Sequence, residues 1–105
     1  DELGEDNNRY SVTGVSNSVV NLNGTEYVIL VDTTSGAVTV NLPASPDNGT
    51  AVKIKDTGNA LNNNITITNG TIDGDTTALI NTNYGALELV YDGTSGEWYS
   101  LAFIN

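Results

Sequence analysis

Turn-forming residues interrupt this chain so often that helices have little room to form. From Tyr10 onward, Gly, Pro or clusters of Asn and Asp recur about every eight to twelve residues. No apolar stripe with the 3.6-residue period of a helix survives between them. The segments in between are rich in Val, Ile, Thr and aromatic residues, and Ala37–Leu42 alternates apolar with polar residues as a half-buried strand does. We therefore predict an all-β fold: an antiparallel, jelly-roll-like β-sandwich over residues 10–105, preceded by an acidic arm at residues 1–9.

Two segments are apolar on both faces rather than on one. Tyr27–Val31 is a continuous apolar run, which predicts a central strand that is covered on both sides. Glu97–Ile104 is apolar on both faces as well. Strict alternation places Trp98, Ala102 and Ile104 on one face and Tyr99, Leu101 and Phe103 on the other. A single sandwich has only one interior, so either this strand lies in the middle of the sheet or its second face meets another subunit. For the second case we predict a homotrimer whose interface includes Trp98, Tyr99, Leu101 and Phe103.

The composition excludes several functional classes. The chain has no Cys and no His, so thiol nucleophiles, Ser-His pairs and the usual zinc ligands are absent, and we predict that it is not an enzyme. Its net charge of −10 disfavours binding to nucleic acid and to anionic lipid surfaces. There is no run of eighteen apolar residues that would predict a membrane span.

Charged residues cluster at three places. Asp73, Asp75 and Asp92 lie beside Gly, where carboxylates either stabilise turns or contribute to a Ca²⁺ site; turns are the favoured interpretation, and no cofactor is predicted. Lys53 and Lys55, two of only three cations in the chain, share one face of a predicted strand. The N-terminal arm holds four of the thirteen acids and is interpreted as a solvated tail or as a docking peptide.

Three aromatic residues are candidates for contact with a glycan. Tyr84, Trp98 and Tyr99 have flat apolar rings that stack on sugars, and neighbouring Asn and Thr side chains pair with hydroxyl groups. Packing in the core or between subunits is the alternative role of these rings.

A series of turn and core segments resembles a β-domain that recurs in tailed-phage virion proteins, at the ends of tail and head fibres and as small stand-alone proteins. The resemblance covers roughly residues 27–100. It is carried by Tyr27–Pro43, Asn48-Gly49, Val52–Asp56, Gly58–Ala60, Asn64–Ile67, Thr71–Gly74, Ile80–Gly85, Tyr91–Gly93 and Glu97-Trp98. It implies an antiparallel sandwich that forms a homotrimeric knob or a capsid decoration.

The resemblance also implies a function. We expect a non-enzymatic structural protein on the exterior surface of a tailed-phage virion, with copies of itself, a capsid or tail protein and possible host-surface glycans as partners. A stand-alone carbohydrate-binding module is one alternative. A self-assembling prokaryotic filament is another, with Tyr10–Leu22 as the donated strand.

No repeat of 20 to 50 residues is present, which argues against a solenoid.

Overall fold

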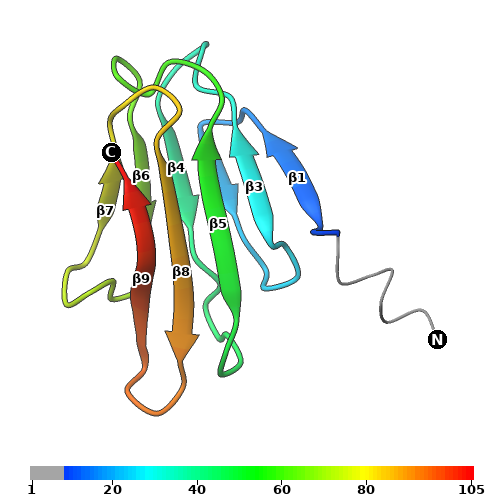
Figure 1. Cartoon of the computed structure of the whole chain (residues 1–105), viewed down its shortest axis with the longest axis vertical. Helices are drawn as coiled ribbons and strands as arrows, with labels where there is room; N and C mark the ends of the chain where they lie inside the picture. The colour runs from blue at the N-terminus through cyan, green and yellow to red at the C-terminus, as the bar shows by residue number, and fades with distance from the viewer. Residues whose placement is uncertain (1–8) are drawn as a thin grey trace.

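A computed structural model describes residues 9–105, which form nine strands and no helix. The larger sheet has the order β1 (Val12–Val15), β3 (Val28–Val31), β5 (Ala51–Asp56), β8 (Ala86–Asp92) and β9 (Glu97–Ile104). The smaller sheet has the order β2 (Val19–Asn21), β4 (Val38–Asn41), β6 (Ile65–Thr68) and β7 (Ala78–Ile80). Figure 1 shows β1 and β9 at opposite sides of the larger sheet. The all-β prediction is confirmed, and no helix that could cross a membrane occurs among the described residues.

The prediction of antiparallel sheets is wrong for six of the nine strands. β1, β3 and β5 pair in parallel in the larger sheet, and β2, β4 and β6 do so in the smaller one. Antiparallel pairing occurs only where β8, β9 and β7 complete the sheets. The strands of a jelly roll pair antiparallel, so this arrangement is not a jelly roll.

The turn after β3 shows why the sequence suggested antiparallel sheets. The Asp32 carboxylate accepts hydrogen bonds from the backbone N–H (3.0 Å) and the hydroxyl (2.7 Å) of Thr34. This turn does not return the chain to a neighbouring strand, because it joins β3 in the larger sheet to β4 in the smaller one. Local turn chemistry reverses the chain but does not decide whether the next strand pairs laterally or crosses to the facing sheet.

The chain thus winds three times between the two sheets, as β1–β2, β3–β4 and β5–β6. The windings differ in length. Val12 lies beside Val28, which is 16 residues further on, whereas Val28 lies beside Lys53, which is 25 residues further on. Coils of unequal length produce no sequence period, so the missing repeat does not exclude solenoid-like winding.

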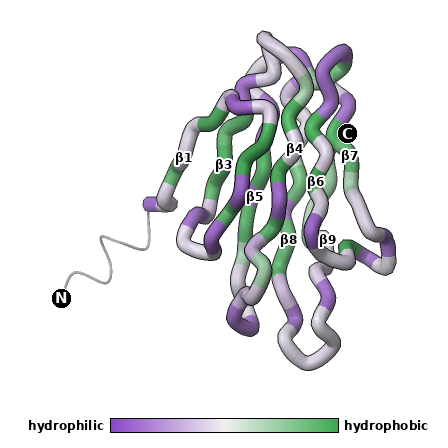
Figure 2. The backbone as a smooth tube through the Cα atoms, turned by 180° about the vertical axis from the view of Figure 1, so that it is seen from behind, coloured by the Kyte–Doolittle hydropathy of each residue, from purple (hydrophilic) through white to green (hydrophobic). Residues whose placement is uncertain are grey.

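One apolar core fills the space between the sheets. Every other residue of the central strands points inward, and Figure 2 shows hydrophobic residues recurring along β4, β5 and β8. The fully buried side chains are Trp98, Ile29, Leu42, Ile54, Ile65, Ile67, Ile80, Leu87, Leu89, Val31, Val38 and Val40. Each such aliphatic side chain contributes roughly 1.5–3 kcal/mol by leaving water.

A buried carboxylate connects three segments at one end of this core. Asp56 accepts hydrogen bonds from the Thr33 hydroxyl (2.7 Å) and from the backbone N–H groups of Tyr84 (2.9 Å) and Ala60 (3.3 Å). Burial raises the pKa of Asp56, but these bonds outweigh it, so the pKa lies below its ordinary value. The same junction requires Gly58, because a Cβ there would lie 2.7 Å from the backbone nitrogen of Thr33.

Candidate functional site

The outer face of the larger sheet is the side that points away from the smaller sheet. Residues directly opposite each other on paired strands share a face, so the strand register gives complete rows across it. The rows are Val12, Val28, Lys53, Glu88 and Ala102; then Gly14, Leu30, Lys55, Ala86 and Ile104; and, over three strands, Ala51, Val90 and Tyr99. All of these residues are at least partly exposed. These rows are apolar apart from Lys53, Lys55 and Glu88, whereas the next pair along β8 and β9, Asp92 and Glu97, is acidic.

Strand β3 contributes two half-exposed aliphatic residues to this outer face. Val28 and Leu30 point outward, whereas Ile29 and Val31 are fully buried in the core. The prediction that Tyr27–Val31 is covered on both faces is therefore wrong for a single chain, because the second sheet covers only the inner side. The apolar outer half of this strand is therefore only partly buried in the single chain.

Strand β9 lies at the edge of the larger sheet, and a β-bulge changes which of its residues share a face. Ser100 pairs with Leu89 and Ala102 pairs with Glu88, so Leu101 is the extra residue. Beyond the bulge, Phe103 pairs with Leu87 on the inner side, and Ile104 lies on the outer face. The predicted grouping by strict alternation is therefore wrong after Ser100, since one inserted residue exchanges the two faces.

The end of β9 exposes large apolar side chains. Tyr99 is 40% exposed, Leu101 67%, Phe103 50% and Ile104 62%. Trp98, in contrast, is 1% exposed and packs in the core with its ring centroid 5.3 Å from that of Tyr91. The prediction of Trp98 as an interface or glycan-contact residue is therefore wrong, because its ring offers no surface to a partner.

The hydrogen-bonding edge of β9 is covered over its first half. The backbone N–H of Trp98 donates to the carbonyl of Thr71 (2.8 Å), and that of Asp73 donates to the carbonyl of Trp98 (2.9 Å). The Asp73 carboxylate accepts from the hydroxyl (2.5 Å) and the N–H (3.0 Å) of Ser100. The exposed apolar end of the strand, Leu101–Ile104, begins directly after this covered stretch.

The acidic Gly turns serve as turns in the described structure. Hydrogen bonds from the Ser100 hydroxyl and N–H lower the pKa of Asp73. Bonds from the Ser95 side chain and the Thr94 N–H do the same for the pKa of Asp92. Nowhere in residues 9–105 do three or more acidic side chains come together as metal ligands, so Asp73, Asp75 and Asp92 are not assembled into a Ca²⁺ site.

The two exposed aromatic candidates for glycan contact do not lie together. Tyr99 is opposite Val90, whereas Tyr84 precedes Ala86, which is opposite Ile104 at the far end of β9. Tyr99 and Ile104 are five residues apart along β9. At a rise of about 3.3 Å per residue, the two ends of this stretch, and with them Tyr99 and Tyr84, lie roughly 16 Å apart. Each ring is exposed, but they do not form one stacking platform.

Lys53 is enclosed by aromatic rings that sequence reasoning missed. Its Nζ lies 4.7 Å from the ring centroid of Tyr10, 5.4 Å from that of Tyr27 and 3.7 Å from Oε2 of Glu88. Desolvation lowers the pKa of Lys53, but the Glu88 carboxylate and the two tyrosines outweigh it and raise the pKa. In the sequence, both tyrosines directly precede strands. This position indicates that they lie together only once β1 and β3 are known to pair in parallel.

Lys55 has different neighbours. Its Nζ donates to the backbone carbonyl of Tyr84 at 2.6 Å and lies 5.9 Å from the ring centroid of that residue. Within residues 9–105 its ammonium forms no ion pair, whereas that of Lys53 does. Lys55 therefore carries the less compensated positive charge of this face.

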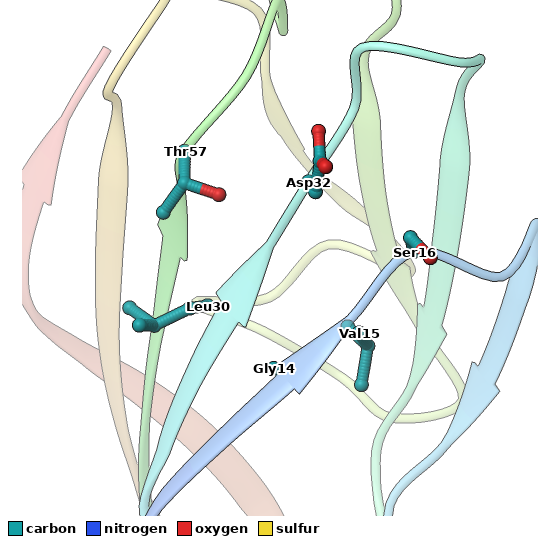
Figure 3. Close-up of a pocket in the computed structure, with 6 residues that line it drawn as sticks. All are labelled: Gly14, Val15, Ser16, Leu30, Asp32 and Thr57. Carbon is teal, nitrogen blue, oxygen red and sulfur yellow. The ribbon is translucent and has the colours of Figure 1, made fainter.

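A shallow groove of about 490 Å³ lies where β1 and β3 run side by side (Figure 3). It is lined by Gly14, Val15, Ser16, Leu30, Asp32 and Thr57. The space arises at Gly14, because a Cβ at that position would meet nothing within 4 Å. Asp32 is its one titratable side chain, and the N–H and hydroxyl of Thr34 lower the pKa of that carboxylate. This lining offers no nucleophile paired with a base.

The outer face of the smaller sheet has a different chemistry. Its rows are Val19, Thr39, Thr66 and Leu79, and then Asn21, Asn41 and Thr68. The amide of Asn41 donates to the side-chain oxygen of Asn21 at 2.7 Å. Hydroxyl and amide groups dominate the centre of this face, so water satisfies it without a partner.

Comparison with known proteins supports the fold alone. No protein-family model and no curated protein matches the chain. Among solved structures, the chain is similar to one described as "Structure of a chaperone-substrate complex", with 12% sequence identity and a TM-score of 0.62. The match covers 89% of this chain but only 18% of the other, so this chain corresponds to a small part of that protein.

Proposed function

We propose that this chain is a non-enzymatic structural protein that associates with copies of itself through the end of β9, as a homotrimer. The observation that carries the proposal is the exposed apolar end Leu101–Ile104 on an edge strand. It continues into the apolar rows of the outer face through Ile104 and Tyr99. A monomer that leaves an apolar patch of several hundred Å² in water is uncommon, since burying such a patch is favourable.

Closed symmetry is the second part of the proposal. A ring of three copies uses each apolar patch without leaving a free one, whereas an open head-to-tail contact would polymerise. The covered first half of β9 supports association through side chains rather than through strand addition along the whole edge, because Asp73 and Thr71 already occupy that edge.

We propose a tailed-phage virion as the setting, on the strength of the segments between residues 27 and 100 that resemble the virion β-domain. The trimer would be a capsid decoration or the end domain of a head or tail fibre. It would lie on the exterior of the particle and attach to a capsid or tail protein. Any contact with host-surface glycan would use Tyr84 or Tyr99 separately, since the two are distant.

The filament alternative finds less support. Its proposed donor, Tyr10–Leu22, contains β1 and β2, and these strands already pair with β3 and β4 of the same chain. A donated strand would have to leave both pairings. A stand-alone carbohydrate-binding module is the other alternative, and for it a monomer would be expected.

The mass of the native assembly tests the proposal. Size-exclusion chromatography with light scattering, over a 100-fold range of protein concentration, is expected to give a constant mass of about 33 kDa, three times the 11.0 kDa of the chain. A monomer at all concentrations would contradict self-association. A mass that grows with concentration would support the filament instead.

A further inference from the structure

We propose that Asn23 is a site of self-catalysed deamidation, with Glu26 as the base and Thr25 as the donor that activates its side-chain amide. The tripeptide Asn-Gly-Thr occurs three times in the chain, beginning at Asn23, Asn48 and Asn69. In each, the backbone nitrogen of Gly can attack the side-chain carbonyl carbon of Asn, because Gly has no side chain that obstructs ring closure. Since the three tripeptides are identical, a difference in their reactivity reports the tertiary structure around them.

The reaction forms one bond and breaks another. The nitrogen of Gly24 gives up its proton and bonds to Cγ of Asn23, while the Cγ–Nδ2 bond breaks and Nδ2 takes up a proton and leaves as ammonia. Water then opens the succinimide ring to aspartate or isoaspartate, so water is the sole co-reactant and nothing is oxidised or reduced. The groups that accelerate this step are an acceptor for the Gly proton and a donor to the Asn oxygen.

Both groups are present at Asn23. The N–H of Gly24 donates to Oε1 of Glu26 at 3.2 Å, so a carboxylate faces the nitrogen that must lose its proton. Oδ1 of Asn23 accepts from the N–H (3.0 Å) and the hydroxyl (2.7 Å) of Thr25, and negative charge develops on this oxygen during the attack. The turn is exposed, and a Cβ on Gly24 would meet only Pro43, at 4.0 Å, so the ring has room to close.

The surroundings of Asn48 lack the base. The N–H of Gly49 donates to the backbone carbonyl of Tyr91 at 2.8 Å, and a carbonyl is too weak a base to take the proton. Oδ1 of Asn48 accepts from the N–H of Gly93 at 2.8 Å. These two bonds hold the turn against the end of β8 and the turn that follows it, so closing the ring would have to break them.

Asn69 is held through its leaving group. Its Nδ2 donates to the backbone carbonyl of Leu42 at 2.8 Å. Gly70 packs against Trp98, because a Cβ on Gly70 would lie 2.9 Å from Cδ1 of the indole. Asn48 and Asn69 are therefore expected to react slowly in the folded chain, and they serve as internal references for Asn23.

Isotope labelling measures all three sites in one sample of the full chain. The folded protein is incubated at neutral pH in water enriched in the heavy oxygen isotope and digested in ordinary water, so only product formed before digestion carries the label. Cleavage after Tyr27 and Lys53 places the three tripeptides on separate peptides for mass spectrometry. Asn23 is expected to deamidate at least about tenfold faster than Asn48 or Asn69 in the folded chain, and at a similar rate to both in denaturant. Equal rates in the folded chain, or the same excess at Asn23 in denaturant, would overturn the proposal.

Glu26→Gln tests the base directly. It is expected to slow deamidation at Asn23 by about fivefold or more. The matched control is Glu97→Gln, which removes the same charge from an acid that forms no hydrogen bond with Asn23 or its two successors, and it should leave the rate unchanged. The rates at Asn48 and Asn69 show whether each variant is folded, because both rise in an unfolded chain. A Glu26→Gln rate at Asn23 equal to or above that of the wild type, with the two references still slow, would exclude Glu26 as the base.

The donor is tested separately. Thr25→Val removes the hydroxyl that contacts Oδ1 and is expected to slow deamidation at Asn23, whereas Thr25→Ser keeps a hydroxyl and should retain the wild-type rate. Identical rates in the Val and Ser variants would remove Thr25 from the proposal.

Discussion

The two outer faces of this molecule have different chemistry, although both belong to sheets wound from the same alternating strands. The face of the smaller sheet carries Thr39, Thr66 and Asn41 at its centre, whereas the face of the larger sheet carries Val28 and Leu30. An alternating strand such as β4 needs one apolar cover and receives it from the facing sheet. A continuously apolar strand such as β3 needs two covers, and one chain supplies only one. The polar face is satisfied by solvent, whereas the apolar face leaves Val28 and Leu30 partly exposed in a single chain.

The outer side of β9 is expected to lie outside the core. Substitution of two adjacent aromatic residues, one on each side of the strand, tests this expectation. Trp98→Ala is expected to lower the free energy of unfolding by about 3–5 kcal/mol, because it empties a fully buried site. Tyr99→Ala is expected to lower it by less than about 1 kcal/mol, because that ring is partly exposed. Denaturant titrations measure both losses. They are followed by circular dichroism, because Trp98 is the sole tryptophan and its replacement removes the tryptophan fluorescence signal. Equal losses would mean that both sides of β9 are core.

Assembly should respond to the exposed end of β9 and not to the outer face of the smaller sheet. Leu101→Asp is expected to weaken self-association by about 2–4 kcal/mol, which is enough to dissociate a trimer at micromolar concentration, because a charge replaces an exposed apolar side chain of the proposed interface. Phe103→Asp should act in the same direction. Thr39→Asp, on the polar face of the smaller sheet, is the matched control and should leave the mass unchanged. Light scattering that finds all three variants identical to the wild type would remove β9 from the interface.

The buried Asp56 joins the turn after β3, the loop after β5 and the segment before β8, so its loss should lower stability. Asp56→Ala leaves the Thr33 hydroxyl and the N–H groups of Tyr84 and Ala60 without their acceptor, at an expected cost of about 2–4 kcal/mol.

The pH dependence has a defined sign. The pKa of Asp56 is lowered in the folded state, so its ionised form stabilises the fold above the unfolded pKa of about 3.9, and this contribution is lost as the pH falls through the folded value. Thermal melts between pH 7 and pH 2.5 should show a smaller acid destabilisation in Asp56→Asn than in the wild type. An unchanged pH profile would remove Asp56 as a source of acid sensitivity.

The smallest effect is expected on the polar face itself. Asn41→Ala removes the exposed 2.7 Å bond to Asn21 and should cost about 0.5–1 kcal/mol of unfolding free energy without changing the mass of the assembly. Thr66→Val should be nearly neutral, within about 0.5 kcal/mol. Chemical denaturation resolves the first change and sets a limit on the second. A large loss of assembly in either variant would mean that partners also bind the smaller sheet.

The sequence by itself determined the all-β class and the inward residues of most strands. Alternation at Val38 and Val40, and at Val52 and Ile54, predicts the side that becomes buried, because side chains of an extended chain point to opposite faces whatever strand lies beside them. It also determined that Lys53 and Lys55 share a face, that the end of β9 is apolar on both sides, and that turns separate the strands.

Only the tertiary structure decided which strands pair. A turn such as Asp32–Gly36 reverses the chain equally well into a hairpin or across to the facing sheet, so parallel winding cannot be read from its residues. The bulge at Leu101, the burial of Trp98 and the approach of Tyr10 to Lys53 depend on contacts between residues far apart in the chain. Pairing energy is gained between strands, whereas alternation and turn preference act within them. The buried face of each strand was therefore predictable from the sequence, whereas the strands that pair with it were not.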